Sequence, residues 1–341
     1  MAALMPAAVY VGERKVKVEQ IPVPTPSPGG VVVEVAYCGI CGTDLHMVMD
    51  GWGRPGTVYG HELSGTVVAV GREVDGLRPG DRVAGGPGPG CGSCTACAEG
   101  RPNLCRARPD YVAPDAPGAF ARFKALPAGC AYPLPEGLDL RAAALVEPLA
   151  VAVHGAARSG ARPGDRALVS GAGPIGVLTA VALARAGCEV TVSEPAEARR
   201  ALAAGLGVDV VAPDELERPS LATSLAERPY RLAVECSGSA EAAEAALGVL
   251  DRGGTLVLAG TGMRRPRLDS NRMILHELSV TGTVDSTPED VREAISMLAS
   301  GDVPVAALVE PDDRGLDQVQ RAMEQLSSGL LAGKVMVSPR A

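Results

Sequence analysis

Four cysteines spaced closely along the chain form its most specific chemical pattern. Cys91, Cys94, Cys97 and Cys105 follow the spacing Cys-x2-Cys-x2-Cys-x7-Cys, among glycines that let the backbone wrap around a small ion. Four thiolates surround Zn²⁺ tetrahedrally and leave no open position, which is typical of a structural site. The first residues do not resemble an export signal, so clustered cysteines favour a metal over disulfides. We therefore predict a structural zinc that holds a lobe in shape and performs no chemistry.

A second set of candidate ligands is spread over three distant segments. The stretch 38–46, CGICGTDLH, offers thiolate, hydroxyl and imidazole groups. His61 and Glu62 place an imidazole beside a carboxylate, and Glu147 stands directly before a proline. A mixed set of sulfur, nitrogen and oxygen ligands with one open position is what a catalytic zinc requires.

Each member of this second set also has a plain structural interpretation. His46 could be a surface residue, Glu147 a helix cap, and the Cys38–Cys41 pair a minor zinc knuckle. Their joint occurrence beside the four-cysteine lobe favours a catalytic metal site.

A glycine-rich turn at 171–176 predicts a dinucleotide-binding loop. Its G-x-G-x-x-G pattern follows a predicted strand and precedes a predicted helix, and glycines there allow close approach to a pyrophosphate at the helix N-terminus. The residues expected to bind the cofactor are Gly171, Gly173, Pro174, Ile175 and Gly176, with Ser237 and Gly260 in later turns.

Glu194, at the end of the next predicted strand, favours NAD over NADP. A carboxylate there accepts hydrogen bonds from ribose hydroxyls and repels a 2′-phosphate. Arg199 weakens this inference, because a nearby arginine could accept a phosphate. The alternative is that Glu194 is an acid favoured by the dipole of the helix that follows.

The elements that position these groups divide the chain in two. Residues 1–150 contain short strand-like runs, such as 30–35 and 65–70, between turns rich in glycine and proline. From 151 onward, predicted strands at 166–170, 189–193, 232–236, 255–259 and 278–283 alternate with helices, which indicates a parallel sheet covered on both faces. A helix at 288–300 and a strand at 334–337 follow. We predict an α/β protein: a β-rich catalytic domain (1–150 and 286–341) with an inserted Rossmann-type doubly wound domain (151–285).

Composition excludes several other classes of protein. The formal net charge is −8 and no basic stripe appears, which argues against nucleic-acid binding. No apolar run reaches the ~20 residues needed to span a membrane. We expect a cytoplasmic protein.

The chain resembles the medium-chain zinc-dependent alcohol dehydrogenases, especially the sorbitol, butanediol and threonine dehydrogenase branch. The motifs that carry the resemblance are CGICGTDLH, GHELSG, the four-cysteine lobe, EPLAVAVH and GAGPIG, in the family's order and spacing. It implies a GroES-like catalytic domain, with Cys41 and His61 as zinc ligands and with Glu62 and Glu147 ligating directly or through water. Thr43 and His46 match the family's proton relay, whereas Cys38 matches a position without a ligand role. The branch forms homodimers or homotetramers.

The resemblance implies hydride transfer between a secondary alcohol, such as a polyol, cyclitol or amino alcohol, and NAD. Zinc would favour the alkoxide form of the alcohol, and Thr43 and His46 would pass its proton towards solvent. Two alternatives remain open: an enone or quinone reductase of the same fold without catalytic zinc, and a zinc-stabilised nucleotide sensor without turnover.

Three residues suggest that the substrate carries an amine. Asp110 and Tyr111 stand where the sorbitol branch has apolar pocket residues, and Asp285 stands where polyol enzymes often have arginine. A carboxylate in a partly dry cleft is best compensated by a cation or by several hydroxyl donors. The alternative is that Asp110 and Asp285 face water on loops.

Overall fold

A computed structural model describes residues 3–107 and 116–340 and divides into two compact units. Unit 1 comprises 1–147 and 287–341, and unit 2 comprises 148–286. The sequence-based boundaries were 150/151 and 285/286. No helix among the described residues is long and apolar enough to cross a membrane.

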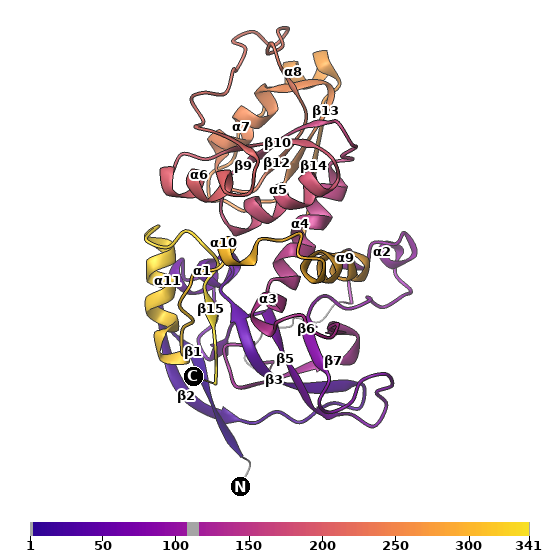
Figure 1. Cartoon of the computed structure of the whole chain (residues 1–341), viewed down its shortest axis with the longest axis vertical. Coiled ribbons are helices and arrows are strands. Elements are labelled where there is room, and N and C mark those ends of the chain that lie inside the picture. The colour runs from indigo at the N-terminus through magenta and orange to yellow at the C-terminus, as the bar shows by residue number, and fades with distance from the viewer. Residues whose placement is uncertain (1–2, 108–115, 341) are drawn as a thin grey trace. The chain divides into compact units, whose positions relative to one another are not determined.

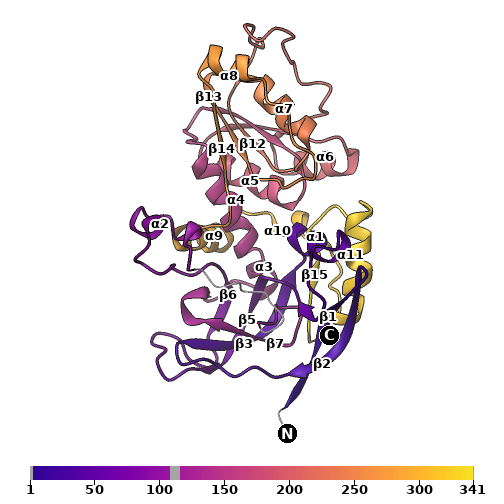
Figure 2. The ribbon, with the colours of Figure 1, turned by 180° about the vertical axis from the view of Figure 1, so that it is seen from behind.

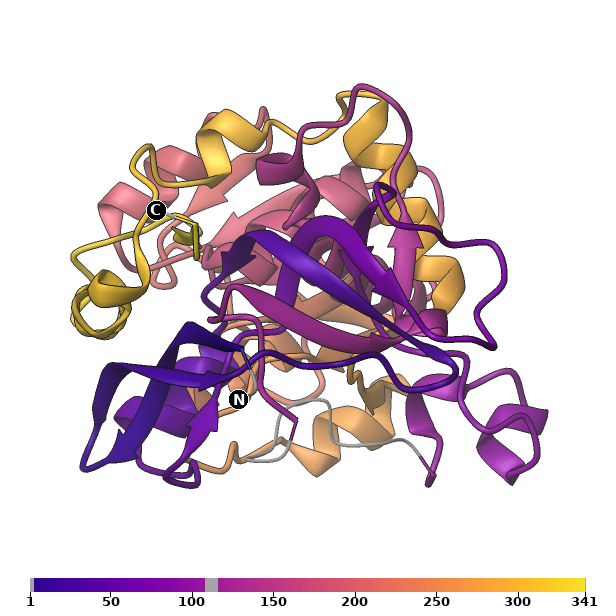
Figure 3. The same cartoon turned by 90° about the horizontal axis from the view of Figure 1, so that it is seen from below.

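Unit 1 is built mainly from antiparallel strands. Its larger sheet has the order β15-β3-β5-β6-β8, with β7 also paired to β3, and a smaller sheet has the order β2-β1-β4. Figure 3 shows these strands curling around the interior of the unit. The strands are β1 (Leu4–Gly12), β2 (Lys15–Pro22), β3 (Gly30–Gly39), β4 (Thr57–Val58), β5 (Glu62–Val70), β6 (Arg82–Gly85), β7 (Phe123–Pro127), β8 (Ala131–Pro133) and β15 (Met336–Val337).

Short helices surround these sheets. In both side views α11 lies beside β2 (Figures 1 and 2), so the C-terminal segment is part of the same unit as the N-terminal strands. Valines that alternate along β3 are fully buried, for example Val31, Val33 and Val35, and anchor the core of unit 1. The helices are α1 (Gly42–Met49), α2 (Thr95–Ala98), α3 (Leu140–Ala143), α9 (Pro288–Ala299), α10 (Val305–Leu308) and α11 (Val319–Ser327).

Unit 2 contains a parallel six-stranded sheet in the order β11-β10-β9-β12-β13-β14. The chain winds outward from β9 in both directions, which is the doubly wound arrangement predicted from the alternating pattern. Its elements are α4 (Val146–Arg158, which begins in unit 1), β9 (Arg166–Ser170), α5 (Pro174–Arg185), β10 (Glu189–Ser193), α6 (Glu197–Ala204), β11 (Asp209–Val211), β12 (Tyr230–Glu235), α7 (Ala240–Gly248), β13 (Leu250–Leu258), α8 (Ser270–His276) and β14 (Ser279–Gly282).

The predicted fold class is confirmed. The predicted strands 166–170 and 189–193 coincide with β9 and β10. The predicted strand 334–337 is shorter than expected, because only Met336 and Val337 pair with β3. Lys334 lies just before that pairing, and its side chain contacts Glu62.

Candidate metal centres and cofactor loop

The four cysteines of the lobe converge on one point. The Sγ–Sγ distances are 4.0 Å for Cys91–Cys97, 3.6 Å for Cys94–Cys97 and 3.9 Å for Cys94–Cys105. Zinc–sulfur bonds of about 2.3 Å in a tetrahedron place the sulfur atoms about 3.8 Å apart. These separations therefore fit a four-coordinate zinc, and all four residues are free thiols.

Local groups prepare the lobe for a cation. The hydroxyl of Ser93 and the backbone N–H of Cys94 donate to the sulfur of Cys91 at 3.5 and 3.4 Å, and such bonds lower the pKa of Cys91 to about 5. Gly90 has φ +75°, and a Cβ there would lie 2.7 Å from the sulfur of Cys97. A side chain at position 90 would displace a candidate ligand, so the glycine is needed for the lobe to close.

Cys41, His61 and Glu62 form a second cluster, in which one candidate ligand atom from each residue lies within 4.8 Å of the others. The sheet register explains how distant segments meet, because Gly39 at the end of β3 pairs with Glu62 at the start of β5. Cys41 then caps the N-terminus of α1. A sulfur, an imidazole nitrogen and a carboxylate oxygen are a suitable donor set for zinc with one position open.

Glu62 supplies the observation that tests this fit. Its side chain is fully buried, and Oε1 accepts a hydrogen bond from the ammonium of Lys334 at 2.6 Å. Oε2 has no hydrogen-bond partner among the described residues. A buried acceptor without a donor is costly, and a cation among these three residues would remove that cost. The second carboxylate oxygen is therefore available to a metal.

Lys334 and Asp44 support this cluster, although the sequence did not single out either residue. Burial would lower the pKa of Lys334, but the Glu62 carboxylate and Cys41 thiol raise it above its usual range, and its ammonium also donates to the Ile40 carbonyl at 3.0 Å. Asp44 is buried and accepts N–H bonds from Cys41 at 2.9 Å and Gly60 at 3.1 Å.

Asp44 also faces His61, with 3.7 Å between Oδ1 and Nδ1. Desolvation would lower the pKa of His61, but Cys41 and Asp44 raise it well above its usual value. A carboxylate behind a ligating imidazole fixes the orientation of the ring. The Cys41-x-x-Asp44 spacing was the available signal, since it matches a capping box at the start of α1.

Thr43, His46 and Glu147 are not part of the three-residue cluster. Thr43 lies in the first turn of α1, where its backbone N–H donates to the sulfur of Cys41 at 3.4 Å. His46 lies one turn later on the same helix, half-buried, with Nδ1 2.6 Å from Oδ2 of Asp50. Glu147 lies in the first turn of α4 and is close enough to raise the pKa of His61.

Of the three residues suggested for the substrate pocket, only Asp285 lies in the described part of the chain. Asp110 and Tyr111 lie outside the described residues. Asp285 belongs to unit 2, has the left-handed backbone conformation with φ +56°, and accepts the N–H of Ser286 at 2.6 Å. Its part in substrate binding stays a prediction.

The glycine loop follows β9 and leads into α5, as its pattern predicted. Gly171 has φ +98°, and a Cβ on Gly176 would lie 1.9 Å from the carbonyl oxygen of Gly171. Gly173 caps α5 and Pro174 begins it, with Ile175 in the same first turn. These positions leave the backbone accessible at a helix N-terminus, which suits a pyrophosphate.

Glu194 does more than the sequence suggested. Its Oε2 accepts the N–H of Ala172 at 2.8 Å and its Oε1 the N–H of Ala196 at 2.9 Å, so the carboxylate ties the glycine loop to the start of α6. Arg199 is half-buried. The guanidinium of Arg200 donates to the carbonyl oxygens of Glu194 and Pro195 at 2.8 and 2.6 Å.

A second buried carboxylate holds the loops that contain Ser237 and Gly260. Oε1 of Glu235 accepts from the N–H groups of Ser237 and Gly238 at 2.7 and 3.0 Å, and from the Ser237 hydroxyl. Burial raises the pKa of Glu235. A Cβ on Gly260 would lie 2.1 Å from the nitrogen of Gly238, so the two loops touch. No local sequence pattern indicates this role of Glu235.

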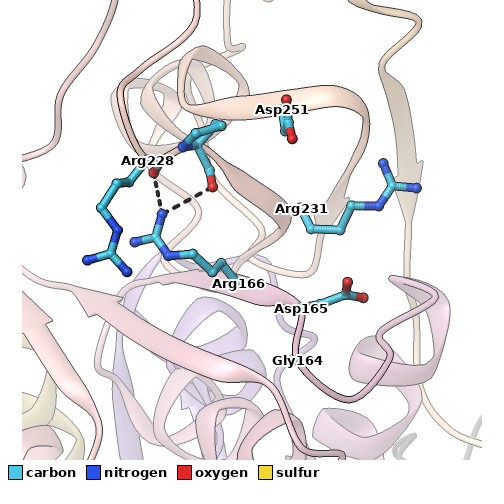
Figure 4. A pocket seen from close by; sticks show the side chains of 7 residues that line it. Gly164, Asp165, Arg166, Arg228, Arg231 and Asp251 are labelled. Atoms are coloured by element: carbon cyan, nitrogen blue, oxygen red, sulfur yellow. Dashed lines mark hydrogen bonds between the residues drawn. The ribbon is translucent and has the colours of Figure 1, made fainter.

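An open pocket of about 380 Å³ lies at the opposite edge of this sheet, where β9, β12 and β13 begin (Figure 4). Arg166 is held there by the carbonyl oxygens of Arg228 and Pro229 and lies 4.5 Å from the centre of the Tyr230 ring. No residue predicted to bind the cofactor lines this pocket.

Two family models match this chain. Residues 27–136 match the family model described as alcohol dehydrogenase GroES-like domain, and residues 174–300 match the one described as zinc-binding dehydrogenase. Sorbitol dehydrogenase of Bacillus subtilis is 34% identical over 98% of this chain and 97% of its own. L-Threonine 3-dehydrogenase of Thermococcus kodakarensis is 34% identical over 99% and 98%. A solved zinc-binding dehydrogenase from Sinorhizobium meliloti bound to NADP is 29% identical, with a TM-score of 0.86 over 99% of this chain and 100% of that one.

Proposed function

Because the chain belongs to the zinc-dependent medium-chain alcohol dehydrogenases, we propose that it oxidises a secondary alcohol at the cluster of Cys41, His61 and Glu62, with NAD as the hydride acceptor. The observation that carries this proposal is the buried carboxylate of Glu62. Its Oε2 has no partner among the described residues, and one of its oxygens lies within 4.8 Å of ligand atoms of Cys41 and His61.

Each residue near the cluster has a distinct task in this reaction. Cys41, His61 and Glu62 hold the metal, with Glu147 as a further carboxylate close to His61. When bound, zinc supplies a Lewis acid that lowers the pKa of the alcohol. The Thr43 hydroxyl takes up the proton of the alcohol while releasing its own, and His46, one helical turn away and partly exposed, receives the released proton and passes it to water.

The preference for NAD rests on Glu194. Its carboxylate is fixed by two backbone N–H groups at the end of β10, and each oxygen keeps a lone pair for a ribose hydroxyl. The same fixed charge repels a 2′-phosphate. The solved relative that holds NADP makes this preference worth testing directly.

The proposed substrate is a polyol, cyclitol or amino alcohol. The names of the relatives, sorbitol dehydrogenase and L-threonine 3-dehydrogenase, include a polyol and an amine-bearing alcohol. Asp110, Tyr111 and Asp285 would make the pocket acidic enough to favour the amine.

We also propose that the protein is cytoplasmic and forms a homodimer or homotetramer. Light scattering would distinguish the two oligomeric states.

The decisive experiment follows alcohol-dependent NADH formation with a panel of polyols, cyclitols and amino alcohols. It should be run on the zinc-loaded protein, on the chelated protein and on Cys41→Ser. We expect turnover only in the zinc-loaded wild type. Equal turnover after zinc removal would instead support a zinc-independent reductase of the same fold. A folded, zinc-loaded protein that binds NADH but turns over no alcohol would support a nucleotide sensor.

A further inference from the structure

The turn after α1 folds back over the last turn of that helix. Gly51 has φ +75°, and the N–H groups of Trp52 and Gly53 then donate to the carbonyl oxygens of His46 and Met47 at 3.4 and 2.8 Å. A Cβ on Gly53 would lie 2.6 Å from that Met47 oxygen and 2.3 Å from the hydroxyl of Tyr59. The path of this turn therefore depends on glycine, and it brings the side chain of Trp52 against that of His46.

Two side chains of this turn hold the imidazole of His46. Oδ2 of Asp50 lies 2.6 Å from Nδ1. The indole of Trp52 stacks on the ring, with 5.0 Å between centroids and 15° between planes. The other ring nitrogen, Nε2, makes no hydrogen bond to any residue in the described part of the chain.

We propose that Asp50 and Trp52 are positioning residues for His46, which fix its ring in the form that leaves Nε2 free to accept the proton of the reaction. The inference rests on the proposed function, in which His46 passes that proton to water.

The physical reason lies in the donors and acceptors. An ionised carboxylate only accepts hydrogen bonds, so the hydrogen in this pair belongs to Nδ1 of the imidazole. A neutral imidazole with its hydrogen on Nδ1 carries its lone pair on Nε2, and the partner of one nitrogen thus decides the chemistry of the other. The Trp52 ring covers one face of the imidazole and hinders its rotation.

The exposure of these side chains fits a role at the end of a proton path. The side chains of His46 and Asp50 are 30% and 46% exposed, so water reaches them. Trp52 is 49% exposed. An indole that fills no core and lies flat on a candidate catalytic histidine is better explained by orienting that histidine than by stabilising the fold.

A purely structural explanation makes a different prediction. A His–Asp pair at i and i+4 stabilises a helix only slightly. In that case the loss of Asp50 would lower stability slightly, and only while His46 is present, but it would leave kcat and the form of the His46 ring unchanged. The two explanations therefore separate in the kinetics and in the imidazole spectra.

The first test needs no turnover. The chain has four histidines, so nitrogen-15 spectra of the imidazoles in the zinc-loaded protein can be assigned by the signal lost in His46→Gln. We expect the Nδ1–H form in the wild type and a mixture in Asp50→Asn, whose amide can also donate to Nδ1. A dominant Nε2–H form in the wild type would overturn the proposal.

The second test is kinetic. We expect Asp50→Asn to lower kcat about tenfold with little change in KM, because general acid–base catalysis by one residue contributes about 10²–10⁴-fold. The kcat of Asp50→Glu should lie between those of Asp50→Asn and the wild type. Trp52→Phe should keep a higher kcat than Trp52→Ala, because the phenyl ring can still stack on His46. In the His46→Gln background, Asp50→Asn should not lower kcat any further. If the double variant instead showed the product of the two single losses in kcat, the proposal would be overturned.

A matched control is Glu73→Gln, which removes an exposed carboxylate of unit 1 whose ion-pair partner among the described residues is Arg72. It should leave kcat and the imidazole spectra unchanged. If the wild type shows the Nδ1–H form and no alcohol turnover, the proposed function fails, while the fixing of the ring by Asp50 and Trp52 is supported.

Discussion

The ammonium of Lys334 lies 2.6 Å from the carboxylate of Glu62, and both side chains are almost completely removed from solvent. The pair joins residues that are 272 positions apart in the chain. Breaking a buried ion pair by removing one partner costs about 3–5 kcal/mol, because the remaining charge is left uncompensated. In this molecule the remaining charge would belong to a candidate metal ligand, so the cost should depend on the metal.

We predict that Lys334→Met destabilises the zinc-free protein by about 3 kcal/mol and the zinc-loaded protein by clearly less. Zinc would compensate the Glu62 carboxylate that the substitution leaves alone. Urea unfolding with and without zinc measures both values. Lys17→Met removes an exposed lysine of β2 and is the control. Equal losses in the two metal states would contradict the prediction.

Removing one thiol from each metal site should affect different properties, stability at the four-cysteine lobe and turnover at the cluster of Cys41, His61 and Glu62. We predict that Cys97→Ser lowers the melting temperature and removes about one zinc per chain, because the lobe of Cys91, Cys94, Cys97 and Cys105 then lacks a ligand. Cys41→Ser should abolish turnover while leaving a folded protein. Metal analysis beside calorimetry checks both, and clean folded wild type without zinc would refute the two-site interpretation.

Replacing Glu194 should change the choice of cofactor. We predict that Glu194→Gln weakens NAD binding and narrows the ratio of kcat/KM for NAD over NADP, because a neutral amide no longer repels a 2′-phosphate. The Ala172 N–H keeps an acceptor in this variant, whereas Glu194→Ala would also release the glycine loop. A wild type that used NADP at least tenfold better would assign recognition to Arg199 or Arg200 instead.

Lys124 should make stability depend on pH. Burial lowers its pKa from 10.5 to about 8, and its ammonium donates to the Pro117 carbonyl at 2.7 Å. Between pH 8 and pH 10.5 the Lys124 side chain is protonated in the unfolded chain but not in the native protein. The free energy of unfolding therefore rises with pH across this range, and this gain is lost as pH falls to about 8. We predict that wild type gains about 3 kcal/mol relative to Lys124→Met between pH 7.5 and about 10.5. Parallel curves would contradict this.

The acidic pocket hypothesis predicts a preference for an amine. The comparison is kcat/KM for an amino-substituted cyclitol against its hydroxyl counterpart, in the wild type and in Asp110→Asn and Asp285→Asn. We expect the wild type to favour the amine and each substitution to reduce that ratio by several fold, since a carboxylate compensates a cation. Identical ratios in all three proteins would leave only a secondary alcohol.

Local patterns predicted what depends on local spacing. The four-cysteine lobe, the turn at Gly171 and strands β9 and β10 each follow from short stretches of sequence, because ligand spacing, glycine conformation and apolar runs act within a few residues. The structure brings Cys41, His61 and Glu62 within 4.8 Å, which the antiparallel register of β3 and β5 explains.

Long-range partners could not be predicted in this way. Nothing around Lys334 indicates that its ammonium meets Glu62, and nothing around Glu235 indicates that it holds two loops. Such contacts depend on where the sheets end and on which strand lies beside which. The Asp50 and Trp52 contacts with His46 are local, but they depend on the left-handed turn at Gly51, which residue types alone left undetermined.

The pairing of Lys334 with Glu62 also sets an order of events during protein synthesis. Unit 2 is translated in full before the codon for residue 334 is read, and domains generally fold as units as they emerge. Residues 1–147 of unit 1, by contrast, are translated long before β15 and before Lys334, whose ammonium compensates Glu62. Until residue 334 has been added, the candidate metal centre of Cys41, His61 and Glu62 lacks the ammonium that compensates the Glu62 carboxylate. A nascent chain arrested shortly before residue 334 should therefore expose this centre, while its nucleotide-binding unit is already folded.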